Sequence, residues 1–526
     1  MKRFSAWCCA LVLTLASCAC VAQQPPQPKV RQAGVAGAFY PADPAALTAM
    51  IDGFLAKAET PKIDGQIFAV VSPHAGYQYS GPVAAYTYAA LKGRKFKRVV
   101  VIAPSHYEAF SYSSVYDGDA YDTPLGMVKV DKEFARKLVS MDRSIQFSER
   151  GHAPTAAGAE HALEVQLPWL QRVIGEFELV PVVMGDQSYE SSRALGVALA
   201  KLIHGDPETL IVASSDLSHY LTYDEATQMD LKTLRALEDW DYLSMSRNFE
   251  MRVWEACGGA PIVAAMIASE RMGATQAKVL KYANSGDTTG DKSRVVGYGS
   301  AVFVKMAGTE AVEAPFTLSA KDKAYLLNLA QQSVEYAVKN GRKLDPPVPA
   351  SEAMKQERGA FVTLTESGEL RGCIGYTSAA MPLYLTVRDT AAYAALRDTR
   401  FTPVTVAELS RLEYEVSVLS PMRRVLDVQQ IKVGKHGLLM KNGRYEGLLL
   451  PQVATEQGWD RHTLLEETCH KAGMNTNCWK DEDTDIFWFT ALVFSRKELK
   501  APDLDEMGPQ HTIAPQGPPA PSSPPR

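Results

Sequence analysis

Short apolar runs alternate with helical patterns through residues 31–306, and this alternation constrains the fold more than any other feature of the chain. The apolar runs predict strands over residues 67–71, 98–103, 179–183, 210–213, 278–282 and 300–304. Apolar residues at helical spacing predict helices over residues 45–57, 82–91, 132–140, 162–173, 191–203, 223–237 and 261–272. Strand–helix alternation is typical of an α/β domain with a mostly parallel sheet.

A polar stretch at residues 307–315 separates this region from one with a different pattern, and we interpret it as a linker. Beyond it we expect helices over residues 320–339, 383–396 and 464–472 and strands over residues 360–365, 414–419 and 487–494. A chain of 526 residues is too long for one ordinary core. We therefore predict a second domain, of the α+β class, over residues 316–498.

The N-terminus has the composition of an export signal. An apolar run from Ala6 to Cys20 follows two basic residues, and it has the length of a signal peptide rather than of a membrane span. Residues 15–18 (LASC) resemble a lipobox, which predicts a lipoprotein-type signal at residues 1–17 and lipidation of Cys18. The alternative is cleavage after Ala22, which would give a soluble periplasmic protein.

A lipidated protein of this kind, with no retention charge at Ala19, is expected on the periplasmic face of the cell envelope as an outer-membrane lipoprotein. Residues 18–30 would form a Pro/Gln-rich spacer, and residues 499–526 a disordered Pro-rich tail. The net charge of -5, without a basic stripe, argues against nucleic-acid binding. Outside the leader, the cysteines are too scattered for a disulfide framework, although Cys469 and Cys478 could pair in an oxidising compartment.

Polar residues follow three of the predicted strands in the first domain. His74 and His106 follow two of them, and Asp216 and His219 follow a third. Because ligands of open α/β sheets bind beyond the carboxyl ends of the strands, we expect these side chains to converge. Neutral imidazole is the commonest ligand of zinc, iron and copper, so two histidines with an anionic third ligand would make an open metal site.

Cys257 is the best candidate for the third ligand. It precedes the helix predicted at residues 261–272, and a helix N-terminus favours negative charge and lowers the pKa of a thiol. Gly258 and Gly259 would let the backbone approach a ligand closely. The alternative for the whole set is structural: hydrogen-bonded histidines, with Asp216 and its neighbouring serines capping the next helix.

Six motifs of the first domain resemble those of the Memo family and occur in the family's order. They lie at residues 34–41 (GVAGAFYP), 73–77 (PHAGY), 104–106 (PSH), 160–164 (EHALE), 214–219 (SSDLSH) and 257–259 (CGG). The resemblance extends over residues 31–306. It implies a fold similar to that of the class III extradiol dioxygenases.

The resemblance also implies a metal site of two histidines and one cysteine, which falls on His74, His106 and Cys257. It implies that His219 occupies the place of the dioxygenases' acid/base histidine, with Asp216 orienting it or holding substrate. Those enzymes bind Fe(II) through two histidines and a carboxylate. Because the third ligand is here a thiolate, we expect one ion of iron or copper, with zinc as an alternative, and dioxygenase activity does not carry over automatically.

Three further polar residues, Glu160, His161 and Glu164, lie in one of these motifs. His161 and Glu164 share a helix face at i, i+3. We consider Glu160 and His161 candidates for a supporting role behind the metal ligands. The alternative is that Glu160 and His161 are ordinary polar residues at the start of a helix.

The second domain resembles the AMMECR family. The signature LRGCIG at residues 370–375, with GAFVTL at 359–364 and GLLLPQ at 447–452, carries a resemblance that covers residues 316–498. The family's biochemical activity is not established. Arg371 and Cys373, at a predicted Gly-flanked turn, are candidates for lining a pocket. The alternative is that the glycines serve a tight turn while Cys373 packs in the core.

Both resemblances together imply a function and a partner. The leading prediction is metal-dependent redox or oxygenase-type chemistry on an unknown small-molecule or peptide substrate. A non-catalytic metal-binding or peptide-binding envelope protein and a zinc-dependent hydrolase are the alternatives. In bacteria the two domains often occur with a radical S-adenosylmethionine protein (the AmmeMemoRadiSam system), but such enzymes are cytoplasmic, so export argues against that partner.

Overall fold

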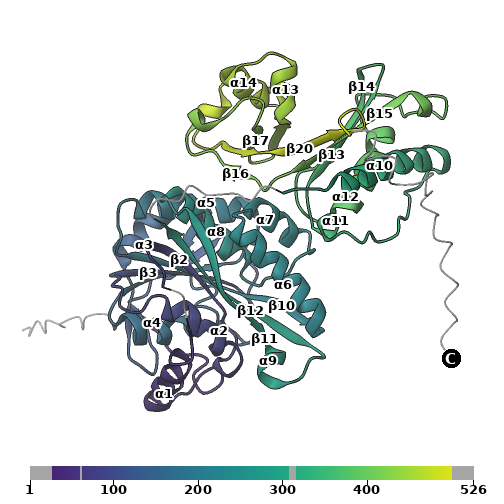
Figure 1. Ribbon diagram of the computed structural model, residues 1–526. Helices are drawn as coiled ribbons and strands as arrows, with labels where there is room; N and C mark the ends of the chain where they lie inside the picture. Colours follow the sequence, from purple (N-terminus) through teal and green to yellow (C-terminus); the bar gives the residue numbers. More distant parts are fainter. Residues whose placement is uncertain (1–26, 60–61, 307–315, 500–526) are drawn as a thin grey trace, which may run out of the picture.

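The computed structural model describes residues 27–59, 62–306 and 316–499. The predicted signal peptide with Cys18, the linker at 307–315 and all but the first residue of the predicted tail lie outside the described residues. Figure 1 shows the chain up to residue 306 forming one body and the later residues forming a second body against it. Within the described ranges, no helix is both long enough and apolar enough to cross a bilayer.

The first domain is built on a nine-stranded sheet of order β10-β12-β2-β9-β3-β8-β4-β7, with β11 paired to β12. Four parallel strands form its centre: β2 (Gln66–Ser72), β9 (Thr209–Ser214), β3 (Arg98–Pro104) and β8 (Glu178–Met184). The flanking strands are β10 (Asp216–Leu221), β11 (Gln276–Asn284), β12 (Val295–Lys305), β4 (Ser113–Val115) and β7 (Ile145–Phe147). The predicted α/β fold with a parallel core is confirmed.

Helices cover both faces of this sheet. Alternate side chains of β3 enter two separate apolar clusters, Val100 and Ile102 on one face and Val99 and Val101 on the other. Burial on both faces is the reason that the central strands appear in the sequence as continuous apolar runs. The helices are α1 (Pro44–Leu55), α2 (Tyr77–Ala89), α3 (Lys132–Val139), α4 (Leu167–Ile174), α5 (Tyr189–Ile203), α6 (Tyr223–Glu238), α7 (Tyr242–Glu250), α8 (Gly259–Arg271) and α9 (Ser285–Thr289).

The structure of the segment after β9 excludes the helix-capping role considered for Asp216 and its neighbouring serines. Residues 216–221 form strand β10, so Asp216 and its neighbouring serines do not cap the following helix. Thr222 caps α6 instead, in a reciprocal capping box with Glu225.

Other departures are smaller. The helix predicted over residues 162–173 is a short 3-10 turn at Glu164–Gln166 followed by α4. A small sheet of β1 (Val30–Arg31), β5 (Ala120–Tyr121) and β6 (Val128–Lys129) was not predicted. Strands of two residues are too short to leave an alternating pattern in the sequence.

The second domain has two lobes, each with an antiparallel four-stranded sheet. One sheet, β14-β13-β15-β20, packs against α10 and α12, and the other, β16-β19-β17-β18, packs against α13 and α14. Its helices are α10 (Ala320–Asn340), α11 (Glu352–Lys355), α12 (Leu383–Leu396), α13 (Pro451–Glu456) and α14 (Arg461–Lys471). Its strands are β13 (Ala360–Glu366), β14 (Glu369–Tyr376), β15 (Leu412–Leu419), β16 (Arg423–Arg424), β17 (Gly437–Asn442), β18 (Tyr445–Leu449), β19 (Asp485–Phe489) and β20 (Ala491–Ser495). The predicted α+β class is confirmed, but the single strand expected at residues 487–494 is two strands in different sheets.

The motif at residues 370–375 lies in strand β14, not in the predicted turn. The turn comes earlier, at Ser367 and Gly368, which both have positive φ (54° and 85°). Gly372 is needed for packing, because a Cβ there would lie 2.2 Å from the carbonyl oxygen of Ala394 in α12. The two glycines of this motif therefore reflect close packing, of helix α12 against Gly372 and of the Phe361 ring of β13 against Gly375.

A disulfide joins Cys469 in α14 to Cys478 in the turn that follows. A crosslink that closes a loop of this size stabilises a fold by roughly 2–3 kcal/mol, mainly by restricting the unfolded chain. We expect reduction to lower the thermal midpoint of the second domain, and a Cys469→Ala, Cys478→Ala double variant to show the same loss. An unchanged midpoint after reduction, with both thiols counted as free, would contradict this expectation.

The two domains share a packed interface. Phe487 and Phe489 of β19 belong to the same apolar cluster as Tyr242 of α7. Beside them the buried carboxylate of Asp485 binds Arg193 (Nε–Oδ2, 2.6 Å), and the same carboxylate binds other arginines from both domains. Apolar and charged contacts together therefore join the two domains.

Candidate metal centre

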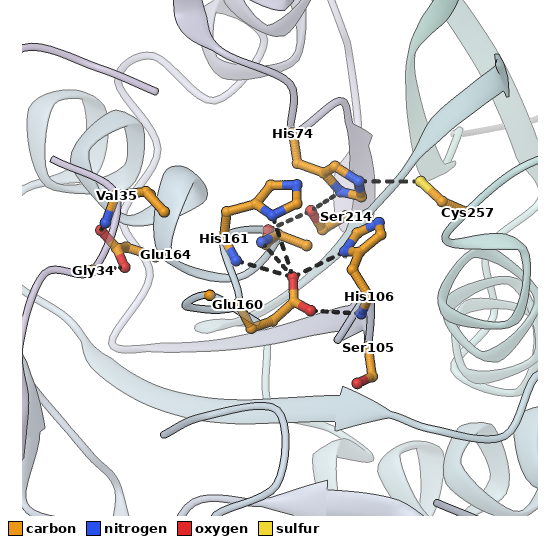
Figure 2. A network of polar contacts seen from close by, with 12 residues as sticks. Gly34, Val35, His74, Ser105, His106, Glu160, His161, Glu164, Ser214 and Cys257 are labelled. Carbon is orange, nitrogen blue, oxygen red and sulfur yellow. Dashed lines mark hydrogen bonds and ion pairs between the residues drawn. The ribbon is translucent and has the colours of Figure 1, made fainter. Parts of the chain in front are cut away.

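Three predicted metal ligands meet at the carboxyl edge of the central sheet. His74 follows β2, His106 follows β3, and Cys257 lies in the turn before α8. One nitrogen of each ring and the sulfur all lie within 4.8 Å of one another (Figure 2). The crossover topology thus brings together residues that are far apart in the sequence.

The His74 ring is oriented by a hydrogen bond on its far nitrogen. Nδ1 lies 2.9 Å from Oγ of Ser214, and Nε2 lies 3.1 Å from Sγ of Cys257. The Ser214 hydroxyl donates its only proton to the carbonyl oxygen of Ala162 (2.6 Å), so it accepts from Nδ1–H of His74. Burial lowers the pKa of His74 well below its usual value. The ring is therefore neutral, and Nε2 presents its lone pair towards the sulfur.

The His106 ring is held in the same way by a carboxylate. Nδ1 donates to Oε1 of Glu160 (2.9 Å), and Oε2 of the same carboxylate accepts the backbone N–H of His106 (2.6 Å). Burial raises the pKa of Glu160, but hydrogen bonding and the charge of His106 outweigh burial and hold this pKa at about 2. Burial lowers the pKa of His106, but the hydrogen bond and the charge of Glu160 outweigh burial and raise it. In the neutral ring this carboxylate fixes the proton on Nδ1, which leaves Nε2 free for a metal.

The Cys257 thiol does not have the low pKa that its helix N-terminus predicts. Burial, followed by the charge of Asp216, raises the pKa of Cys257 well above its usual value. A bound cation would oppose both effects and favour the thiolate. Gly258 allows a close approach, but to the sheet rather than to a ligand, since a Cβ there would lie 2.2 Å from the carbonyl oxygen of Ser214.

Asp216 shapes the site chiefly through the backbone. Its Oδ1 accepts the backbone N–H of His74 (2.7 Å), so its buried carboxylate fixes the turn that carries this residue. Burial raises the pKa of Asp216. His219 lies three residues later on β10 and is partly exposed. A protonated His219 ring would oppose the raised pKa of Asp216 and add to the lowered pKa of His74. Among the described residues, no hydrogen bond joins the Asp216 carboxylate to the His219 ring.

His161 belongs to the site, whereas Glu164 does not. The His161 ring stacks on His106 (centroids 4.7 Å apart). Its buried Nδ1 lies 3.6 Å from Oε1 of Glu160 and has no hydrogen-bond partner within the part of the chain that the structure describes. With His106 and Glu160 it forms a second group of possible ligand atoms. Glu164 instead accepts the backbone N–H groups of Gly34 and Val35 and pairs with Arg31, so it anchors the first segment of the domain.

Sequence reasoning missed Ser214, which orients His74. Its sequence signals are its position at the end of a buried strand and its place in the motif at residues 214–219. It also missed Phe39, whose ring lies 4.4 Å from that of His161. Phe39 belongs to the motif at residues 34–41, whose place beside the site no local pattern reveals.

Comparison with known proteins identifies the family of each domain. The family model described as Memo-like protein matches residues 31–302, just over half of the chain. The chain belongs to the Memo family. The AMMECR1 family model matches residues 327–494, so the second body is an AMMECR domain fused to the Memo domain.

Two curated relatives are MEMO1 family proteins that match about half of this chain over nearly their whole length. MEMO1 family protein MK0963 of Methanopyrus kandleri is 39% identical over 287 residues, which are 52% of this chain and 98% of the relative. A MEMO1 family protein of Sulfolobus acidocaldarius is 37% identical over 290 residues, 52% of this chain and 99% of the relative. Among solved structures, uncharacterized protein PH0010 from Pyrococcus horikoshii is 39% identical to this chain. The match covers 34% of this chain and 92% of the PH0010 chain, with a TM-score of 0.33.

The two candidate residues of the AMMECR domain, Arg371 and Cys373, have different surroundings. Cys373 lines a cavity of about 1390 Å³ in this domain, where its thiol accepts a hydrogen bond from the Thr363 hydroxyl. Arg371 does not line this cavity. It is the extra residue of a bulge in β14, and its guanidinium pairs with Glu408 (Nε–Oε1, 2.8 Å). Cys373 thus reaches a cavity, whereas Arg371 has a structural partner.

Replacing Glu160 by glutamine is expected to weaken metal binding by roughly 10–100-fold, the usual cost of changing a residue behind a histidine ligand. The amide keeps an acceptor for the backbone N–H of His106 but loses the charge that fixes the ring. Competition between the protein and a chelator for cobalt(II) measures this effect. Glu133→Gln is the matched control, because the Glu133 side chain on α3 is 76% exposed. Equal cobalt affinity in both variants would contradict the role of Glu160.

Proposed function

We propose that the Memo domain is a metal-dependent redox or oxygenase-type protein that holds one iron or copper ion between His74, His106 and Cys257. The convergence of two oriented imidazole nitrogens with one sulfur carries this proposal. Nδ1 of each ring makes a hydrogen bond, to Ser214 or to Glu160, so the lone pair of each Nε2 is available to bind a metal. Three protein ligands leave coordination positions for substrate or oxygen.

Iron or copper bound here would supply electron-transfer and oxygen chemistry that no side chain of the site provides. The surrounding residues would bind substrate and move protons. In this proposal His219 accepts or donates a proton at its ring, and Asp216 supports it while holding the turn of His74. His161, whose buried Nδ1 lies 3.6 Å from Oε1 of Glu160 without a hydrogen bond among the described residues, would accept a hydrogen bond from the substrate, a small molecule or a peptide.

We also propose that the protein is exported and anchored through a lipidated Cys18. The leader sequence supports this, and so does the Cys469–Cys478 disulfide, because such bonds persist in oxidising compartments. A cytoplasmic radical S-adenosylmethionine partner would not be present in that compartment. The Memo and AMMECR domains are then proposed to work as a pair without it.

Oxygen consumption tests the catalytic part of the proposal. Protein reconstituted anaerobically with iron(II) or copper(I) should consume oxygen in the presence of a reductant. His219→Gln should retain the metal and lose most of this rate. A bound metal without oxygen consumption with any reductant would favour a non-catalytic metal-binding protein. Zinc in the purified protein together with cleavage of generic esters or amides would favour the hydrolase.

A further inference from the structure

We propose that the AMMECR domain is a positioning element of the metal centre, and that it holds the turn carrying Cys257 through Glu357 and residues 377–379. This inference rests on the metal site of the proposed function. It assigns the second domain a defined task at that site. The contacts run from the AMMECR domain to α7, then to the turn, and then to the sulfur.

The three predicted ligands differ in how they are supported. His74 and His106 follow central strands that are buried on both faces. Cys257 instead ends the turn 251–257 between α7 and α8, in which Met251 and Val253 are exposed. Arg252 in this turn has a φ of 56°, in the left-handed region that a non-glycine residue adopts only when its surroundings enforce it. The third ligand therefore depends on neighbouring structure more than the other two.

A carboxylate of the AMMECR domain supplies one such support. The indole N–H of Trp254 donates to Oε2 of Glu357 (3.3 Å), and Oε1 of the same carboxylate pairs with Lys232 of α6 (2.7 Å). Trp254 is buried, and Glu357 is almost entirely covered. Glu357 thus ties the turn to α6 three residues before Cys257.

The segment after β14 holds α7 in a similar way. Asn248 is fully buried and donates from its side-chain amide to the carbonyl oxygen of Ala379 (3.1 Å), while Arg247 donates to the hydroxyl of Thr377 (2.6 Å). The backbone carbonyl of Asn248 in turn accepts the N–H groups of Val253 and Trp254. The position of the turn therefore follows the position of α7.

Alpha helix 7 also fixes the start of α8. A Cβ on Gly259 would lie 2.7 Å from the ring of Phe249 in α7, so the two elements are in close contact. A metal site requires its ligand atoms to be placed within about 0.5 Å. The Cys257 sulfur is also held from the sheet side, by the Asp216 N–H (3.3 Å) and by the bond from Gly258 N–H to Ser215 Oγ (3.0 Å). A shift of α7 or of the turn would act against this hold and disturb the sulfur while leaving His74 and His106 in place.

Cobalt(II) binding to the full-length protein tests the proposal. Glu357→Ala should lower cobalt affinity about tenfold or more and weaken the near-ultraviolet charge-transfer band of the thiolate, a signal that a general loss of stability would not select. Glu357→Gln, which keeps an acceptor for Trp254, should recover most of both. The control is Glu352→Ala on α11, whose side chain is 84% exposed and pairs with Lys355. Wild-type affinity and an unchanged band in Glu357→Ala would overturn the proposal.

Alkylation of the metal-free protein separates this inference from the proposed function. Iodoacetamide should modify Cys257 severalfold faster in Glu357→Ala than in the wild type, with the rate at Cys373 unchanged, as read by peptide mapping. If the wild type binds no cobalt, the metal proposal fails and the alkylation rate alone decides this inference. Trp254→Phe removes the other partner of the same bond and should act in the same direction if Glu357→Ala fails to fold. Equal rates at Cys257 in the wild type and in the folded variant would overturn the positioning role.

Discussion

Replacing His74 by alanine is expected to abolish stoichiometric metal binding and leave the fold intact. The variant removes one of the two imidazole nitrogens of the site, and a site of one nitrogen and one sulfur would not compete with a chelator. Ser214 keeps its bonds to Ala162 and to Gln166, so no buried hydroxyl loses all of its partners. Metal content per chain by elemental analysis, with circular dichroism as the check on folding, measures the result.

The control for this variant is His462→Ala, whose side chain is 58% exposed and lies in the AMMECR domain. It should bind as much metal as the wild type. Full metal occupancy in His74→Ala would remove His74 from the site, and the group formed by His106, Glu160 and His161 would then become the candidate.

The largest loss of stability is expected from Glu164→Ala, at about 3–5 kcal/mol. The side chains of Arg31 and Glu164 are 3% and 0% exposed, so the variant leaves a buried guanidinium without its carboxylate. The backbone N–H groups of Gly34 and Val35 and the Tyr40 hydroxyl lose an acceptor at the same time. Urea unfolding followed by the fluorescence of the Memo domain measures the change.

A surface ion pair provides the comparison for this variant. Asp52 and Arg172 form a pair in which both side chains are 43% exposed, and Asp52→Ala should cost only about 0–1 kcal/mol. If Glu164→Ala destabilised the protein no more than Asp52→Ala does, the network around Glu164 would not anchor the first segment of the domain. Metal affinity should fall little in a folded Glu164→Ala protein, because Glu164 contacts none of the three predicted ligands.

The parts of the fold that the sequence predicts well are those whose burial leaves a local pattern. The central strands are covered on both faces, and their unbroken apolar runs show it. The predicted ligands are recognisable for a related reason, because parallel strands deliver the residues that follow them to one edge of the sheet. Cys257 was found partly through its position before a helix and partly through the family resemblance.

Features that depend on distant contacts were not predictable. Strand β14 contains glycines that are typical of a turn, but they are explained by distant contacts, the approach of α12 to Gly372 and of the Phe361 ring to Gly375. Residues 485–495 have the apolar character of one strand, but they serve two sheets. The pKa of Cys257 was predicted in the wrong direction, because the helix N-terminus is visible in the sequence whereas the burial of the thiol is not.

The interface between the domains is the other feature that the sequence does not reveal. It joins residues such as Trp254 and Glu357, which are separated by about a hundred positions and share no motif. The two curated relatives, which match about half of this chain over nearly their whole length, lack any counterpart of Glu357 from a second domain. The positioning role proposed for the AMMECR domain is therefore a property of the fused chain.

X-ray absorption spectroscopy of the metal-loaded protein, beside Cys257→Ala, tests the central claim most directly. A site formed by His74, His106 and Cys257 predicts one sulfur neighbour at about 2.3 Å and two imidazole nitrogens at about 2.0–2.1 Å from the metal. The sulfur signal should disappear in Cys257→Ala. A metal surrounded only by nitrogen and oxygen in the wild type, or a sulfur signal that persists in Cys257→Ala, would contradict the account.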